Sequence, residues 1–314
     1  MNPPATPPSA VRSLRGPFRL ALAMLVVTTL TILKGAMTTS TGSGLAYPDY
    51  PLSDGQLMPE SSYTTIPGFL EHFHRLFAAS AGLLSLSLWL WLQLGQLGDL
   101  RVRRWAFGGG CLILAQGLFG GFGVLLKLPA FTSVTHATLA QLTLATFAYI
   151  AYQLSDRYRA TEPLTSVPTG SGRTLAIIAL LSLVVQTVFG AIARHTNSPH
   201  ALWTHVGNAF VVFIIATIAT AFAQGRLGDT PGIKSLVRWL VLLLITQIGL
   251  GFVVLGVRNP AGKTQANVEN LGTAFTISMH VVLGALLTVL MATLAAHVFR
   301  ATRAPAKRQQ DAFA

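Results

Sequence analysis

Long apolar stretches, each nearly free of charged residues, dominate this chain and restrict what it can fold into. Charged residues make up only 10% of the chain, whereas soluble domains average about 25%. Each stretch reaches the roughly 20 residues that a helix needs to cross a bilayer. The sequence therefore predicts an all-α integral membrane protein with eight transmembrane helices, at approximately residues 18–39, 69–94, 104–126, 131–154, 174–194, 201–224, 237–257 and 274–299.

The basic residues lie between the apolar stretches and mostly on one side of the predicted membrane. A net charge of +12 could indicate a nucleic-acid partner, but nucleic-acid binders gather Lys and Arg on one solvated face. The positive-inside rule explains the pattern better, and it places both termini in the cytoplasm, with the lipid bilayer as the surroundings and no nucleic acid as a partner. The cytoplasmic basic residues are Arg12, Arg15, Arg19, Arg101, Arg103, Arg104, Arg157, Arg159, Arg173, Arg226, Lys234, Arg238, Arg300, Arg303, Lys307 and Arg308, whereas the outer loops carry Lys127, Arg194, Arg258 and Lys263.

The chain also divides into two similar halves. We expect two pseudo-symmetric four-helix bundles, an N-terminal half at residues 17–155 and a C-terminal half at 172–300, with cytoplasmic tails at 1–16 and 301–314. Each half begins on the cytoplasmic side, so the repeats are parallel. The matching positions are Gly35-Ala36 with Gly190-Ala191, Gln116 with Gln247, Gly120 with Gly251, and Phe122 with Phe252.

Four of the eight histidines occupy equivalent positions, one in each even-numbered apolar stretch: His74, His136, His205 and His280. Each lies one to two turns inside the outer end, roughly 6–10 Å deep. Ionisable groups at such depth are costly and usually have a function or a partner. One histidine from each of two facing helices suits ligation of a haem iron inside a four-helix bundle, whereas a zinc or copper site needs three or four ligands. The alternative is four unrelated histidines bonded to backbone or water.

Glu71 marks a difference between the halves. It precedes His74 by three residues, so both side chains share one helix face, whereas the matching position before His205 is Leu202. A carboxylate at the first histidine pair alone predicts chemistry in the first half and a redox cofactor in the second. The alternative is that Glu71 only orients His74 or pairs with Arg75.

Other histidines have plainer interpretations. His72 points about 100° away from Glu71 around the helix, and we expect it at the membrane interface. His195 and His200 fall in a short outer loop, where histidines are ordinarily exposed. His297, at the cytoplasmic end of the last helix, is expected to be an interfacial side chain.

Lys34 and Arg75, both near the outer surface, are candidate contacts for haem propionates. Snorkelling to the interface is the alternative for both. The single cysteine, Cys111, excludes an intrachain disulfide and is expected to be a small packing residue.

Several motifs together resemble those of the haem A synthase family. The first helix and outer loop contribute GAMTTSTGSG at 35–44 and PDYP at 48–51. The second helix contributes EHFHR at 71–75, and the third contributes QGLFGG at 116–121. His136, His205 and His280 complete the pattern, so the resemblance extends over all eight predicted helices.

The resemblance implies conversion of haem O to haem A for terminal oxidase assembly, in which the methyl at porphyrin position 8 is oxidised through alcohol-level intermediates to a formyl group. His74 and His136 would hold the substrate haem, with Glu71 taking part in the chemistry, and His205 and His280 would hold haem b as the cofactor. It also implies the bacterial cytoplasmic (inner) membrane as the location. Haem O synthase, oxidase assembly factors and a second copy of the chain are candidate partners.

The first outer loop departs from this resemblance. Many members carry two cysteines around a Pro-Asp-Trp-Pro segment, where this chain has Tyr47, Ser53 and, for the tryptophan, Tyr50. A thiol–disulfide role is therefore not expected here. The loop at 40–68 is acidic and lacks Lys and Arg, and a second long outer loop spans 258–273. We expect such loops to cover a site or to bind a partner.

Three other functions stay open from the sequence. A dihaem electron-transfer cytochrome is one, although ligands near a single membrane face disfavour electron transfer across the bilayer. A transporter with parallel repeats is another, but no carboxylate lies at mid-membrane. A non-enzymatic haem-binding assembly factor is the third, and Glu71 is the residue that would distinguish it from an enzyme.

Overall fold

The computed structural model describes residues 13–164, 169–257 and 268–302. Within these ranges the regular secondary structure is helical, and an isolated antiparallel bridge joins Ser53 and Gln56 in the loop after the first helix. The predicted outer residues Arg258 and Lys263, and most of both tails with Arg12, Arg303, Lys307 and Arg308, lie outside the described residues. The helices are α1 (Arg15–Ser40), α2 (Ser61–Thr64), α3 (Ile66–Leu94), α4 (Leu100–Leu125), α5 (Ala130–Leu154), α6 (Asp156–Ala160), α7 (Thr169–Thr196), α8 (Pro199–Leu227), α9 (Ile233–Val257) and α10 (Leu271–Ala301).

Several helix starts are fixed by side chains that accept a hydrogen bond from the first turn. Thr65 accepts from the Gly68 N–H at the start of α3, and Asp99 accepts from Val102 N–H at the start of α4. Ser198 and Asn270 cap α8 and α10 in the same way. These residue types are the preferred N-caps, because their oxygens satisfy N–H groups that have no partner within the helix.

Within the described residues, seven helices are long and apolar enough to cross a membrane: α1, α3, α4, α7, α8, α9 and α10. The chain is therefore a multi-pass membrane protein. Each predicted apolar stretch coincides with one long helix to within a few residues at each end. The eighth, α5, has 25 residues but buries polar side chains such as Thr132, Gln141 and Thr143. It packs against α1, α4, α7 and α10, so protein surrounds much of it, and polar residues are tolerated there.

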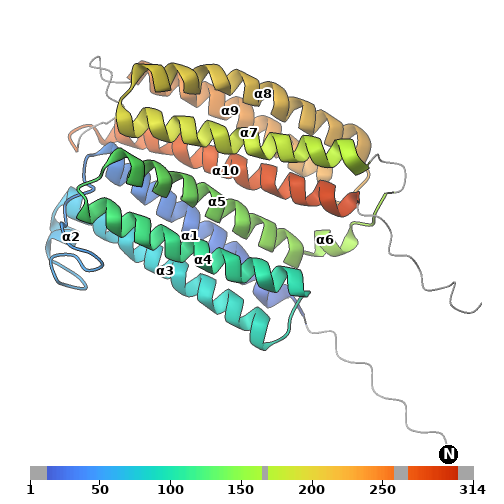
Figure 1. The fold of residues 1–314 in the computed structure, drawn as a ribbon, viewed down its shortest axis with the longest axis horizontal. Coiled ribbons are helices and arrows are strands. Elements are labelled where there is room, and N and C mark those ends of the chain that lie inside the picture. The colour runs from blue at the N-terminus through green and yellow to red at the C-terminus, as the bar shows by residue number, and fades with distance from the viewer. Residues whose placement is uncertain (1–12, 165–168, 258–267, 303–314) are drawn as a thin grey trace, which may run out of the picture.

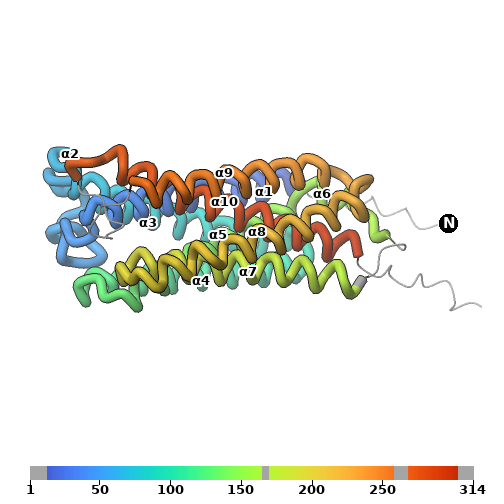
Figure 2. Tube along the Cα trace, turned by 90° about the horizontal axis from the view of Figure 1, so that it is seen from above, coloured from blue at the N-terminus to red at the C-terminus, as the bar shows by residue number. Residues whose placement is uncertain are grey.

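The long helices pack in two groups (Figure 1). In the first, α1 contacts α3 and α5, and α4 contacts the same two helices, so that α3 and α5 lie diagonally opposite. In the second, α8 lies between α7 and α9, and α10 also contacts α7 and α9. The groups meet where α5 packs against α7 and α10, and where α1 packs against α10. The long helices of both groups run nearly along one direction (Figure 2).

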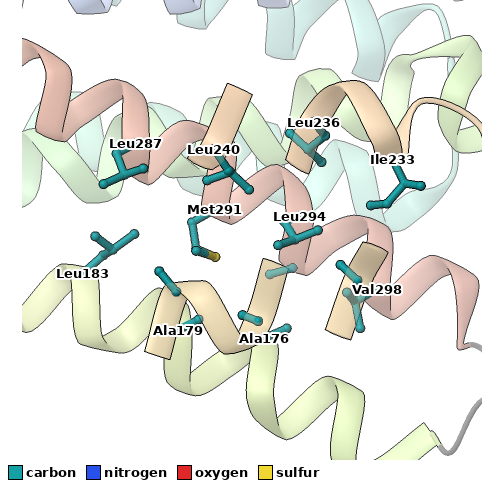
Figure 3. Packing of buried hydrophobic residues seen from close by; sticks show 14 of the residues in the cluster. Ala176, Ala179, Leu183, Ile233, Leu236, Leu240, Leu287, Met291, Leu294 and Val298 are labelled. Atoms are coloured by element: carbon teal, nitrogen blue, oxygen red, sulfur yellow. The ribbon is translucent and has the colours of Figure 1, made fainter. Parts of the chain in front are cut away.

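Each group has its own apolar core, and both cores lie toward the end where α1 begins and α10 ends. In the second group the core joins α7, α9 and α10 through residues such as Ala179, Leu240 and Met291, which point toward one another (Figure 3). In the first group it includes Met24 of α1 and Phe147 of α5, both fully buried. The opposite end carries α2 and the first outer loop (Figure 1).

Candidate functional site

Two pairs of histidines face each other across the helix groups, beyond the apolar cores. His74 of α3 and His136 of α5 have ring centroids 6.3 Å apart and planes at 83°. His205 of α8 and His280 of α10 have centroids 6.3 Å apart and planes at 84°. The structure therefore brings together the four histidines singled out from the sequence, one pair in each group, with nearly the same geometry.

Backbone carbonyls on the neighbouring helix orient three of the imidazoles. The Nδ1 atom lies 3.0 Å from Thr31 O in His74, 3.1 Å from Gln116 O in His136, and 3.1 Å from Gln186 O in His205. A carbonyl can only accept, so Nδ1 carries the proton and Nε2 is left with its lone pair. This is the tautomer that binds a metal through Nε2.

Each of these carbonyls lies one helical turn before a glycine, and the imidazole rests against that glycine. A Cβ atom added to Gly35 would lie 2.7 Å from His74 Cε1, and one added to Gly190 would lie 2.9 Å from His205 Cε1. The corresponding distance is 3.2 Å both for Gly120 under His136 and for Gly251 under His280. The glycines therefore provide the space that lets each ring lie against the neighbouring backbone.

Glutamine side chains add further contacts in the second group. Gln186 Nε2 donates to His205 O at 2.9 Å, and Asn208 Nδ2 donates to Gln186 Oε1 at 2.7 Å. Gln247 Nε2 donates to His280 O at 3.0 Å. These bonds fix the helical turn that carries each histidine.

The spacing of each pair fits a single metal ion between two rings. Two imidazole nitrogens on opposite sides of one ion, at about 2 Å each, put the ring centroids about 6 Å apart, and 6.3 Å is found. Within the described ranges, no three His, Cys, Asp or Glu side chains are grouped so as to hold a metal. A two-histidine site therefore suits an ion whose other ligands come with it, as in haem. All four imidazoles are only partly buried, although they lie between helices, so space adjoins them.

Glu71 is held in place at the outer end of the first pair. Its Oε1 atom accepts from Arg75 Nη2 at 2.5 Å, and its Oε2 atom accepts from the Tyr47 N–H at 3.1 Å. The carboxylate side chain is 4% exposed and that of Arg75 is 11% exposed. Arg75 also donates to the carbonyls of Tyr47, Asp49 and Leu52 in the first outer loop. Glu71 therefore forms the expected ion pair with Arg75. It does not orient His74 through Nδ1, since that atom is bonded to Thr31 O.

Comparison with known proteins identifies the family of this chain. The family model of the COX15-CtaA cytochrome oxidase assembly proteins matches residues 19–211, more than half of the chain. The chain belongs to this family. It is 28% identical over 236 residues to the heme A synthase of Symbiobacterium thermophilum, which covers 73% of this chain and 76% of the relative. It is 27% identical over 318 residues to the heme A synthase of Geobacillus kaustophilus, which covers 91% of each chain.

In this COX15-CtaA protein, hydrogen bonds hold the first outer loop at Tyr47 and Ser53, the two positions where the sequence departs from the resemblance. Tyr47 OH lies 2.9 Å from Ser61 Oγ, and Tyr47 is 1% exposed. Ser53 Oγ lies 2.9 Å from His72 Nδ1. His72 is only 3% exposed, so the expectation that it is interfacial is wrong. The loop covers it because helix α3 begins beneath the loop.

The two candidate propionate contacts differ in their surroundings. Lys34 precedes Gly35, and its Nζ atom lies 3.8 Å from the ring centroid of Phe69 and 5.6 Å from that of Phe73. The Arg75 guanidinium is instead occupied by Glu71 and the loop carbonyls. Lys34 is therefore the better placed of the two to meet an added carboxylate.

Three further expectations are corrected by the structure. His297 is fully buried, with Nδ1 3.0 Å from Tyr152 OH and Nε2 2.7 Å from Thr230 Oγ, because α10 lies inside the helix assembly at this point. His195 belongs to the last turn of α7 and is half-buried, whereas His200 is exposed as expected. Cys111 does not pack inside, since it is exposed on α4.

The sequence of this COX15-CtaA protein did not reveal that the four glycines make room for the histidine rings. In the sequence they indicated only the repeat. The signal was present as a spacing: Gln116 precedes Gly120, and Gln247 precedes Gly251, by four residues, which is one helical turn. Which histidine each glycine faces depends on how neighbouring helices are aligned. Sequence spacing within one helix does not contain that information.

Proposed function

We propose that this protein is a haem A synthase, which converts haem O to haem A by oxidising a porphyrin methyl group to a formyl group, for the assembly of terminal oxidases. Membership of the COX15-CtaA family and the relatives named heme A synthase support this function. One observation carries it for this chain: two histidine pairs have the same geometry, and a buried carboxylate accompanies only the first.

In this proposal His74 and His136 hold the substrate haem, and Glu71 is the catalytic residue. Oxidation of the methyl group releases protons, so the site needs an acceptor near the reacting carbon. Glu71 lies on the same face of α3 as His74, and Arg75 and the Tyr47 N–H keep its carboxylate in one position. The first outer loop, fixed by Arg75, limits the access of water to this carboxylate.

His205 and His280 hold haem b as the cofactor in this proposal. Haem b supplies one-electron transfer when bound. The protein's part is to fix both imidazoles: Gln186 O sets the tautomer of His205, and Gln186 and Gln247 anchor the two histidine carbonyls. Lys34 is retained as a propionate contact, and Arg75 as a weaker candidate.

The finer architecture is also part of the proposal. We assign eight transmembrane helices, with α5 as the eighth, in two pseudo-symmetric bundles at residues 17–155 and 172–300. The circular packing of each helix group and the matched histidine pairs support this assignment. The excess of basic residues at the end where α1 begins supports cytoplasmic termini, with tails at 1–16 and 301–314. The bacterial relatives support the cytoplasmic membrane as the location.

The proposal is tested by expressing the chain in cells that make haem O and have no other haem A synthase. Haem extracted from the membranes is separated by chromatography and identified by its absorption spectrum. Haem A, or its hydroxylated intermediate, should appear with the wild-type chain and be absent with the empty vector. Haem b bound to the protein, with haem O unchanged, would instead favour an electron-transfer cytochrome or a haem-carrying assembly factor. Co-purification of haem O synthase, oxidase assembly factors or a second copy of the chain tests the partners.

A further inference from the structure

Arg194 joins the two helix groups at their outer end. It lies in the last turn of α7, and its side chain reaches α1 of the other group. Its Nη2 atom donates to Ala36 O at 2.7 Å and to Ser40 Oγ at 2.8 Å. The guanidinium is therefore held at a defined position between the groups.

A buried chain of hydroxyl groups continues from Arg194 into α10. Ser40 Oγ lies 3.3 Å from Ser278 Oγ, and both serines are 0% exposed. Because Ser278 Oγ donates to Ala274 O at 2.7 Å, it accepts from Ser40, which in turn accepts from Arg194. Three helices from the two groups are thus connected by one directed series of hydrogen bonds.

This series runs next to the backbone that positions the histidines. Arg194 lies one turn after Gly190, the glycine under His205. Its acceptor Ala36 directly follows Gly35, the glycine under His74. Ser278 lies two residues before His280 on α10, so the series begins beside one histidine of the second pair and ends beside the other.

An arginine side chain keeps its charge under all physiological conditions. In a site shielded from water, a fixed positive charge acts more strongly than it would in solution. The reduced state of a haem carries one positive charge fewer than the oxidised state, so a nearby cation stabilises the reduced state and raises the reduction potential. Hydrogen bonds to Ala36 and Ser40 prevent the side chain from turning away toward the membrane surface.

We propose that Arg194 is the cation that raises the reduction potential of the haem held between His205 and His280. This inference rests on the proposed function, because it requires a haem at that pair. It assigns to Arg194 an electrostatic role distinct from iron ligation and from the carboxylate chemistry at Glu71.

The test is a redox titration of the purified haem-loaded protein, followed by absorption of its low-spin haem. Arg194→Met should lower the midpoint potential by at least the equivalent of a tenfold change in the ratio of reduced to oxidised haem, which is 59 mV for one electron. Arg194→Lys, which keeps the charge, should stay close to wild type. Ser40→Ala, which removes one acceptor but no charge, should do the same. Lys127→Gln removes an exposed outer cation at the α4–α5 turn and serves as the matched control.

An unchanged midpoint potential in Arg194→Met, with haem still bound, would overturn the proposal. So would equal shifts in Arg194→Met and Ser40→Ala, because the hydrogen bonds would then matter instead of the charge. If Arg194→Met loses its haem, Ser40→Asp provides the second variant, since a carboxylate against Arg194 neutralises the same charge and should lower the potential. A wild-type protein without a bis-histidine haem spectrum would contradict the proposed function itself, and the two failures are therefore distinguishable.

Discussion

Replacing Gly190 with alanine should weaken haem binding at the His205–His280 pair without changing any ligand. The added Cβ would lie 2.9 Å from His205 Cε1 and 3.2 Å from its Nδ1. Carbon atoms pack best at about 3.5–4.0 Å, so the imidazole must retreat by roughly 0.6 to 1.1 Å. Metal–ligand distances tolerate about 0.2 Å, and the ring cannot retreat that far while keeping both the metal bond and the bond to Gln186 O.

The expected size follows from the cost of overpacking. Extra methyl groups in a well-packed interior cost about 1–3 kcal/mol, which corresponds to roughly a 5- to 150-fold loss of haem affinity. Haem b per protein is measured from the pyridine haemochrome spectrum of the purified chain during dilution into haem-free detergent. Gly251→Ala should show a smaller loss, since its Cβ would lie 3.2 Å from His280 Cε1.

Gly207→Ala is the matched control. Gly207 lies on α8 two residues after His205, is exposed, and has nothing within 4 Å of an added Cβ. Alanine is also the better helix former, so this variant should retain haem at least as well as wild type. Equal haem retention in Gly190→Ala and Gly207→Ala would refute the idea that the glycine provides space for the ligand.

Three further predictions concern other parts of the molecule. Glu71→Ala should leave haem bound but abolish the oxidised products on chromatography, and unchanged haem A output would remove Glu71 from the chemistry. His297→Leu should lower the free energy of unfolding by about 1–3 kcal/mol, because it leaves the buried Tyr152 hydroxyl without this partner. The haem b content should stay at the wild-type level, and thermal unfolding and haem spectra check the two expectations. The N–H groups of Gly55 and Asp54 lower the pKa of Asp49 below its ordinary value of 3.8. The charged carboxylate of Asp49 therefore stabilises the first outer loop fully when the pH is above this ordinary pKa. The stabilisation is lost as the pH falls through the lower pKa that Asp49 has in the folded protein. Protease resistance of the loop should show this acid dependence, which Asp49→Asn should lack.

Much of the helical framework could be read from the sequence, because membrane-spanning helices need long apolar stretches and the bilayer sets their length. The depth of the four histidines could be read for the same reason, since the helix rise converts sequence position into depth. Pairing of His74 with His136 followed from the repeat. Contacts between helices could not be read, because they depend on rotation and alignment of each helix against its neighbours.

His297, Arg194 and His72 show where that limit lies. Each is a polar residue near the end of a predicted helix, where snorkelling or exposure is the ordinary expectation. In the structure His297 and His72 are buried beneath segments distant in sequence, and Arg194 reaches into the other helix group. Burial at a helix end depends on which loop or helix covers it, and local composition does not reveal this.

The polar character of α5 has a consequence for how the chain enters the membrane during synthesis. A translocation channel releases a segment into lipid according to its apolarity, and α5 falls short of the other long helices by that measure. Only residues 126–129 separate it from α4, so the two can enter the bilayer as one hairpin. Two of its protein neighbours, α7 and α10, are synthesised later. The protein surroundings of α5 are therefore complete only when the last helix has been made. In a chain that ends after α6, the polar side chains of α5 lack these neighbours, and quality-control proteases should recognise it.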